Sequence, residues 1–212
     1  SGRESITAKL TANLLEKSGV DRVLAMDLHS AQIQGYFDIP CDHIYGSPVL
    51  IDYLETLNLE EIVVVSPDVG GVARARAFAK LMKDAPLAII DKRRSAHNIA
   101  ESLTVIGEVK GKTAILIDDM IDTGGTICSG ANLLKKEGAN RIFACASHAV
   151  FSPPSYERLS SKNLFEQVIV TNSIPVIHKD NFPQLKVLSV ANMLGEAIWR
   201  IHEESSVSSM FR

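Results

Sequence analysis

The segment Ile115–Ile127, which reads ILIDDMIDTGGTI, decides the fold class. An apolar run leads into two adjacent carboxylates, Asp118 and Asp119, and the glycine-rich turn Asp122–Thr126 follows before a helical pattern begins. Glycines let the backbone approach a ligand closely, and the amide groups at a helix start carry partial positive charge. The turn therefore predicts a phosphate cradle, and the acidic pair is suited to vicinal hydroxyls, so together they favour a phosphorylated sugar. An ordinary strand–turn–helix connection is the alternative that a short glycine motif alone leaves open.

Outward from this segment, apolar strand-like runs alternate with helical patterns along almost the whole chain. The predicted strands are Arg22–Asp27, Glu61–Ser66, Leu87–Asp91, Thr113–Ile117, Arg141–Ala146 and Gln167–Thr171. Continuous apolar strands between amphipathic helices predict an α/β fold, with a mostly parallel sheet that carries helices on both faces. Ligands of such sheets bind beyond the carboxyl ends of the strands.

Polar segments follow four of these strands at the positions where a ligand is expected. They are Asp27-Leu28-His29, Ser66-Pro67-Asp68, Asp91-Lys92-Arg93-Arg94 and Asp118-Asp119. A further cation, Arg74, follows Gly70-Gly71 near a predicted helix start. It could reach a phosphate or a neighbouring subunit, or lie on an exposed helix face.

Composition excludes several classes of protein. The chain has 212 residues with 46% hydrophobic and 22% charged residues, which is typical of a folded globular protein and not of a disordered one. A formal net charge of −3 disfavours general nucleic-acid binding. No apolar run approaches the ~18 residues of a membrane span, and no signal or transit peptide is visible. Three cysteines at no metal-ligand spacing are expected to be reduced thiols.

Several segments together resemble the ribose-phosphate diphosphokinase (PRPP synthase) family. They are Asp27–Pro40 (DLHSAQIQGYFDIP), Ser66–Gly71 (SPDVGG), Asp91–Arg94 (DKRR) and the C-terminal stretch with Ser206-Val207-Ser208 and Phe211. The resemblance covers essentially the whole chain. It implies a type I phosphoribosyltransferase-like fold over residues 1–212, with 22–46 and 61–186 forming the ligand side.

The same resemblance implies the reaction. The family transfers the diphosphoryl group of ATP to ribose 5-phosphate, which gives PRPP and AMP for nucleotide biosynthesis. Lys92 and Arg94 would stabilise the transition state, since cations are needed where charge develops on the migrating group. The implied contacts with ribose 5-phosphate are Arg94, Asp118, Asp119, Asp122, Thr123, Gly124, Gly125 and Thr126.

A magnesium ion is the implied cofactor. His29 and Asp68 are its expected ligands, and His29 would also contact ATP. Magnesium prefers oxygen ligands and keeps several waters, so contact with a histidine is expected to be partly through water. Asp27, Asp38 and Asp42 are weaker candidates. Asp27 could only orient His29, and Asp38 could be a turn residue.

The resemblance also bears on partners and on what the chain lacks. It implies a homo-oligomer, a hexamer in the family, and an allosteric phosphate or ADP site near Ser206, Ser208 and Phe211. A cytoplasmic location is expected, with an organelle not excluded. In the family, an N-terminal domain with most of the nucleotide contacts precedes the stretch that resembles Ser1–Leu10, so the isolated chain is expected to hold mainly the ribose-phosphate half of the site.

Two alternatives to a synthase remain open. A phosphoribosyltransferase that consumes PRPP would use the same phosphate cradle. A catalytically inactive regulatory subunit or fragment would bind ribose 5-phosphate and turn nothing over. The segments Asp27–Pro40 and Lys92–Arg94 favour the synthase.

Overall fold

The computed structural model describes residues 6–93, 102–161, 164–177 and 182–211. These residues form two compact units. One unit comprises Ser47–Val190, and the other joins Ser1–Gly46 to Ala191–Arg212. Among the described residues, no helix is long and apolar enough to cross a membrane.

The larger unit contains a seven-stranded sheet in the order β5-β4-β3-β6-β7-β8-β9. Its strands are β3 (Ile62–Ser66), β4 (Leu87–Arg93), β5 (Ser102–Ile106), β6 (Thr113–Ile121), β7 (Arg141–Ala149), β8 (Gln167–Thr171) and β9 (Leu185–Leu188). All neighbouring strands are parallel except β4 and β5, which are antiparallel. The prediction of a mostly parallel sheet is confirmed.

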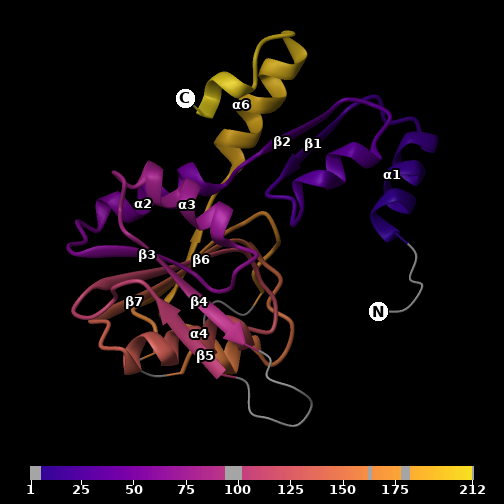
Figure 1. The fold of residues 1–212 in the computed structure, drawn as a ribbon. Coiled ribbons are helices and arrows are strands. Elements are labelled where there is room, and N and C mark those ends of the chain that lie inside the picture. Colours follow the sequence, from indigo (N-terminus) through magenta and orange to yellow (C-terminus); the bar gives the residue numbers. More distant parts are fainter. Residues whose placement is uncertain (1–5, 94–101, 162–163, 178–181, 212) are drawn as a thin grey trace. The chain divides into compact units, whose positions relative to one another are not determined.

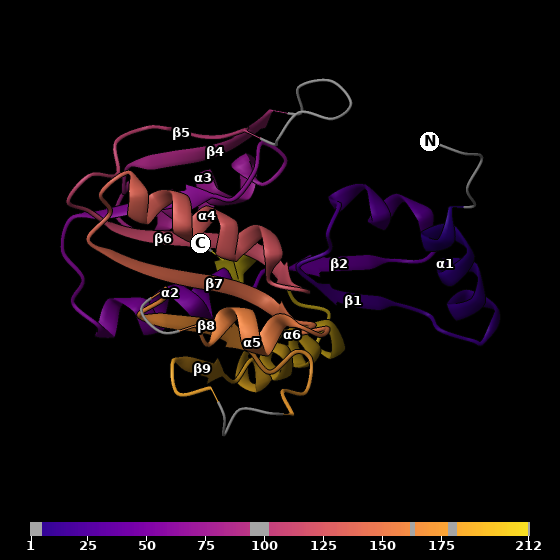
Figure 2. The ribbon, with the colours of Figure 1, turned by 90° about the horizontal axis from the view of Figure 1, so that it is seen from below.

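Helices cover both faces of this sheet, as predicted. Helices α2 (Ser47–Thr56) and α3 (Val72–Leu81) lie on one face, and α4 (Gly125–Lys136) and α5 (Ser155–Leu159) lie on the other (Figures 1 and 2). In β6, Ile115 faces the α2 and α3 side, whereas Leu116 faces the α4 side. Successive side chains of a strand point to opposite faces, so a strand covered twice is apolar throughout.

Strand β6 is longer than the sequence pattern predicts. It continues past Ile117 through the acidic pair to Ile121, because β7 runs alongside it and pairs Asp118 with Ala146 and Met120 with His148. Polar side chains at the end of a strand do not break a backbone ladder that a neighbouring strand supplies. The edge strands β5 and β9 are present although the sequence pattern did not predict them.

The smaller unit is built around a separate sheet of two parallel strands. Its elements are α1 (Thr7–Lys17), β1 (Val23–Met26), η1 (Ala31–Tyr36), β2 (Cys41–Ile44), α6 (Ala191–His202) and η3 (Ser208–Phe211). Ile44, Ala197 and Val207 form its buried centre. The strand predicted at Arg22–Asp27 therefore exists but is not part of the large sheet. That 22–46 and 61–186 form one ligand side stays a prediction.

Candidate functional site

The acidic pair lies at the carboxyl end of β6 and is partly withdrawn from solvent. The Asp118 side chain is 21% exposed and the Asp119 side chain only 2%. The Asp119 amide donates a hydrogen bond to Asp118 Oδ1 over 2.9 Å, which fixes the first carboxylate against the strand end. Asp118 therefore presents the more accessible of the two carboxylates.

Arg74 on α3 joins the two carboxylates. Its Nη1 lies 3.0 Å from Asp118 Oδ1 and 3.2 Å from Asp119 Oδ1, and its own side chain is 28% exposed. One cation thus faces two carboxylates in a partly buried place, where removal of the cation leaves negative charge uncompensated. The sequence left three roles open for Arg74: contact with a phosphate, contact with a neighbouring subunit, or a place on an exposed helix face. In the structure its partner is instead the acidic pair.

The environment of Asp118 raises the pKa of its carboxyl group from 3.8 to about 7. Burial is the largest cause because it disfavours the charged form. The neighbouring Asp119 also raises this pKa, whereas the charge of Arg74 lowers it. Asp118 therefore changes its ionisation near neutral pH, and both the hydrogen bond from the Asp119 amide and the charge of Arg74 favour its ionised state.

The glycine-rich turn leads directly into α4. Gly124 has φ +72°, a left-handed conformation that glycine adopts without a steric penalty, and it is the residue before the first helical position. No side chain caps this end of α4. The first amides of an α-helix have no partner within the helix, so those of Gly125 and Thr126 are suited to bind an anion. The side chains of Asp122, Thr123 and Thr126 are exposed beside them.

Asp68 lies in the turn after β3. Its Oδ1 accepts a hydrogen bond from the Gly71 amide over 2.8 Å, and its carbonyl oxygen accepts one from the Ser66 hydroxyl over 2.7 Å. A Cβ atom on Gly71 would lie 2.9 Å from Ser66 Oγ and 3.9 Å from Arg74 Nη1, so only glycine fits here. This turn orients an exposed carboxylate next to the arginine that holds the acidic pair.

Lys92 lies inside β4, which extends two residues beyond the predicted Leu87–Asp91. It pairs with Leu103 of the antiparallel strand β5, and its side chain is exposed. The prediction that Lys92 follows the end of this strand is wrong for the backbone, because β5 continues the ladder there. Arg94 lies outside the described residues.

The larger unit brings together most of the predicted sugar-phosphate residues. Strand β3 lies between β4 and β6, and the three run parallel. Their carboxyl ends consequently lie at one edge of the sheet, with Lys92, Asp68 and the acidic pair on neighbouring strands.

His29, Asp27, Asp38 and Asp42 belong to the smaller unit. Asp27 is buried and has φ +44°, and its Oδ2 accepts a hydrogen bond from the Gly46 amide over 2.8 Å. His43, which the sequence analysis did not select, accepts a hydrogen bond at Nε2 from the Leu28 amide over 2.9 Å. Burial lowers the pKa of His43, which favours the neutral ring that this bond requires. The two residues that precede the exposed His29 are thus held in place.

Two of the weaker candidate metal ligands have cationic partners. Asp38 lies 3.5 Å from Lys9 Nζ, and Asp42 accepts a 2.7 Å hydrogen bond from Arg22 Nε. In the described part of the chain, no group of three or more histidine, cysteine, aspartate or glutamate residues is placed to hold a metal ion. His29 of the smaller unit and Asp68 of the larger unit are each exposed, and their assignment as magnesium ligands stays a prediction.

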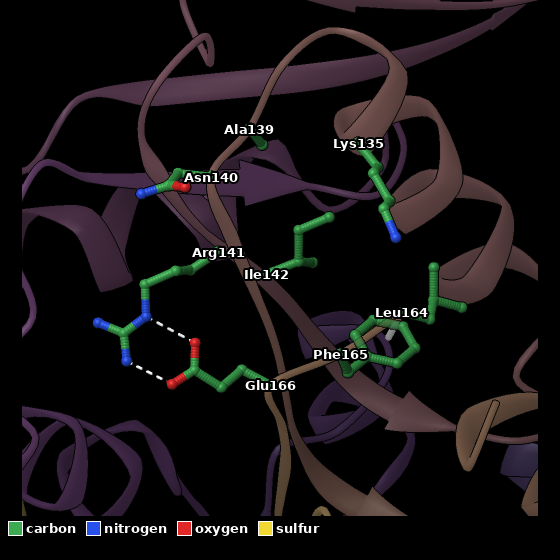
Figure 3. Close-up of a pocket in the computed structure, with 8 residues that line it drawn as sticks. All are labelled: Lys135, Ala139, Asn140, Arg141, Ile142, Leu164, Phe165 and Glu166. Atoms are coloured by element: carbon green, nitrogen blue, oxygen red, sulfur yellow. Dashed lines mark hydrogen bonds and ion pairs between the residues drawn. The ribbon is translucent and has the colours of Figure 1, made fainter. Parts of the chain in front are cut away.

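A cavity of about 300 Å³ lies at the opposite ends of the strands. It is lined by Lys135, Ala139, Asn140, Arg141, Ile142, Leu164, Phe165 and Glu166. Arg141 begins β7 and Glu166 precedes β8, and Figure 3 shows the two-point ion pair between them, with Arg141 Nε 2.6 Å from Glu166 Oε2. The cavity is therefore separate from the sugar-phosphate residues.

The model of one protein family, described as the phosphoribosyl synthetase-associated domain, matches residues 94–212. The chain is 95% identical over 212 residues to a ribose-phosphate pyrophosphokinase of Prochlorococcus marinus and covers 64% of that protein. It is 65% identical to ribose-phosphate pyrophosphokinase 1 of Spinacia oleracea and covers 63% of it. A crystal structure of phosphoribosylpyrophosphate synthetase from Mycobacterium smegmatis superimposes with a TM-score of 0.88 at 44% identity, over 96% of this chain and 66% of that one. The chain thus spans a little under two thirds of these relatives.

Proposed function

Because the chain belongs to the phosphoribosyl synthetase family, we propose that the full-length protein is a ribose-phosphate diphosphokinase. The oxygen on C1 of ribose 5-phosphate attacks the β-phosphorus of ATP. The bond from that phosphorus to the α,β-bridging oxygen breaks, AMP leaves with its electron pair, and the hydroxyl proton is released. The product, PRPP, serves nucleotide biosynthesis.

The observation that carries this proposal is the acidic pair that leads into the uncapped start of α4. The 5-phosphate binds the amides and hydroxyls of Asp122–Thr126, where the helix dipole favours negative charge. Asp118 accepts hydrogen bonds from the ribose hydroxyls, and the nearly buried Asp119 lies behind it. Arg74 holds the pair in place and favours the ionised form of Asp118, which accepts hydrogen bonds and does not donate them.

The nucleotide half of the reaction is assigned to residues outside this cradle. His29 would contact the ATP phosphates. His29 and Asp68 are the proposed magnesium ligands, and the ion would supply positive charge to the diphosphoryl group. Lys92 and Arg94 stabilise the charge that develops on the migrating group and on the leaving oxygen. Asp27, Asp38 and Asp42 are not needed as ligands, since their carboxylates have partners within their own unit.

The two alternatives would use the same phosphate cradle, one to bind PRPP and the other to bind ribose 5-phosphate without turnover. A phosphoribosyltransferase would bind PRPP there, but the similarity over the whole chain favours the synthase. A regulatory subunit would bind ribose 5-phosphate without turnover, and the presence of Lys92 and His29 argues against that role. For the full-length protein we further propose a homo-oligomer, a hexamer as in the family, with a phosphate or ADP site near Ser206 and a cytoplasmic location.

Calorimetry on the 212-residue chain tests the sugar-phosphate site. Ribose 5-phosphate is titrated first, and ribose second, because only the former carries the anion that the cradle recognises. Thr126→Val, which replaces a hydroxyl by a methyl group, should weaken ribose 5-phosphate binding by ~5- to 10-fold. Thr56→Val, the same change at the end of α2, should leave it unchanged. A folded chain that binds neither sugar would refute the proposed site in this chain.

A further inference from the structure

Helix α5 packs directly against the phosphate loop. Leu159 is fully buried, and its Cγ would lie 3.2 Å from a Cβ atom on Gly124. Gly124 thus combines a left-handed backbone conformation with a close neighbour, Leu159, at the place where a larger side chain would lie. No motif links α5 to the loop, since the two segments lie about 35 residues apart in sequence.

The side chain of Arg158, next to Leu159, reaches the loop backbone. Its Nη1 donates a hydrogen bond to the Thr123 carbonyl oxygen over 3.1 Å. The same atom would lie 3.4 Å from a Cβ atom on Gly125. Burial raises the pKa of the Cys128 thiol and the positive charge of Arg158 lowers it, so the charge also acts on the first turn of α4. One guanidinium therefore lies along the turn that begins the helix.

The geometry of the peptide unit gives this contact a consequence for anion binding. The Thr123 carbonyl and the Gly124 amide belong to the same planar trans peptide and point in opposite directions. Glycine populates positive and negative φ with similar ease, so this peptide has little intrinsic preference against turning over. A donor that holds the carbonyl fixes the direction of the Gly124 amide, and that amide adjoins the helix start where the phosphate is proposed to bind.

We propose that Arg158 is a positioning residue of the phosphate site: its hydrogen bond to Thr123 holds the Asp122–Thr126 backbone in the anion-binding conformation before ligand arrives. The ligand class, a sugar phosphate, rests on the proposed function. The orientation of the loop does not, because it is a property of the ligand-free chain.

The first measurement uses the ligand-free chain labelled with ¹⁵N. Arg158→Met should shift or broaden the amide resonances of Gly124 and Gly125 and increase their hydrogen exchange by ~10-fold or more. Arg158→Lys, which retains a charged donor, should restore most of the wild-type behaviour. Lys136→Met removes an exposed cation from the far end of α4 and should leave these amides unchanged. The thermal midpoint of each variant shows whether the fold is retained.

The second measurement is the affinity for ribose 5-phosphate. Arg158→Met should weaken it by ~10-fold, as expected for the loss of one charge-assisted hydrogen bond, and Arg158→Lys by ~3-fold or less. If wild type does not bind the sugar phosphate, the proposed function fails, and the amide measurement still decides the positioning role. A folded Arg158→Met variant with wild-type Gly124 and Gly125 amides would overturn the inference. A variant that loses binding only because its thermal midpoint collapses would overturn it as well.

Discussion

Replacing Arg74 by methionine should uncouple the acidic pair from its cation with little change in side-chain length. The guanidinium Nη1 lies 3.0 Å from Asp118 Oδ1 and 3.2 Å from Asp119 Oδ1, so both carboxylates lose the same partner. The remaining charge is partly buried, because the exposed fractions of the two carboxylate side chains are 21% and 2%. We therefore expect the effect to appear as a higher pKa of Asp118.

The size of the effect follows from the charge that is removed. An opposite charge at this range lowers the pKa of a carboxyl group by ~1–3 units, and the charge of Arg74 is the smallest of the influences on Asp118, so Arg74→Met should raise the pKa of Asp118 from about 7 by ~1 unit. This corresponds to ~1.4 kcal/mol. At pH 7 the ionised fraction of Asp118 falls from roughly one half to ~10%, so ribose 5-phosphate should bind ~5-fold more weakly.

The assay is a carbon-13 titration of the Asp118 carboxyl group, together with calorimetric affinities between pH 6 and pH 9.5. In wild type the affinity should rise with pH through about 7, but ionisation of the ligand's phosphate, with a pKa near ~6, contributes to that rise. The comparison with Arg74→Met removes this ambiguity because both proteins bind the same ligand. Arg74→Lys should keep the midpoint near the wild-type value, and Lys80→Met, at the exposed end of α3, serves as the control. A folded Arg74→Met variant that titrates like wild type would refute the reasoning.

Three further predictions follow from individual residues. Asp118→Asn should stabilise the larger unit increasingly as pH rises from ~4 to ~7, since the folded state keeps a proton that the unfolded chain releases near 3.8. Urea unfolding should reveal an effect that is larger at pH 8 than at pH 5 by ~2.5 kcal/mol, and an equal effect at both values would contradict the raised pKa. Gly124→Ala should lower the free energy of unfolding by ~1–2 kcal/mol because of its positive φ and the Leu159 contact, whereas Gly125→Ala in the helix should cost little. Equal unfolding midpoints for the two glycine variants would count against the loop geometry. Lys92→Ala in the full-length protein should reduce kcat by ~10²–10³-fold with KM for ribose 5-phosphate within a few-fold, and steady-state kinetics showing only a raised KM would reassign Lys92 to substrate binding.

The central strands were predictable because their apolar runs are continuous and are separated by helical patterns. The edge strands were not: Leu185–Leu188 is four residues long and includes Lys186, and Ser102–Ile106 alternates polar and apolar residues because only one of its faces is covered. The return of α6 to the first 46 residues was not predictable either. It depends on packing between Ile44 and Ala197, which nothing in the local pattern of either segment specifies.

Candidate site residues could be predicted from the sequence where they lie next to one another in the chain. Asp118, Asp119 and the glycine-rich turn form one continuous stretch, so their residue types predict their role together. The two arginines that organise this stretch are distant in sequence, with Arg74 44 residues from Asp118 and Arg158 35 residues from Thr123. The sequence analysis names Arg74 only as a cation near a predicted helix start and does not single out Arg158, because long-range side-chain contacts leave no periodic signal.

The most direct test is a titration of the ¹⁵N-labelled 212-residue chain with ribose 5-phosphate, with ribose as the matched ligand that lacks the anion. The account predicts that ribose 5-phosphate shifts the amide resonances of Gly124, Gly125 and Thr126 and that ribose leaves them unchanged. Binding of ribose 5-phosphate that leaves these three amides unmoved, for example with shifts confined to the cavity beside Arg141 and Glu166, would contradict the placement of the 5-phosphate at the start of α4.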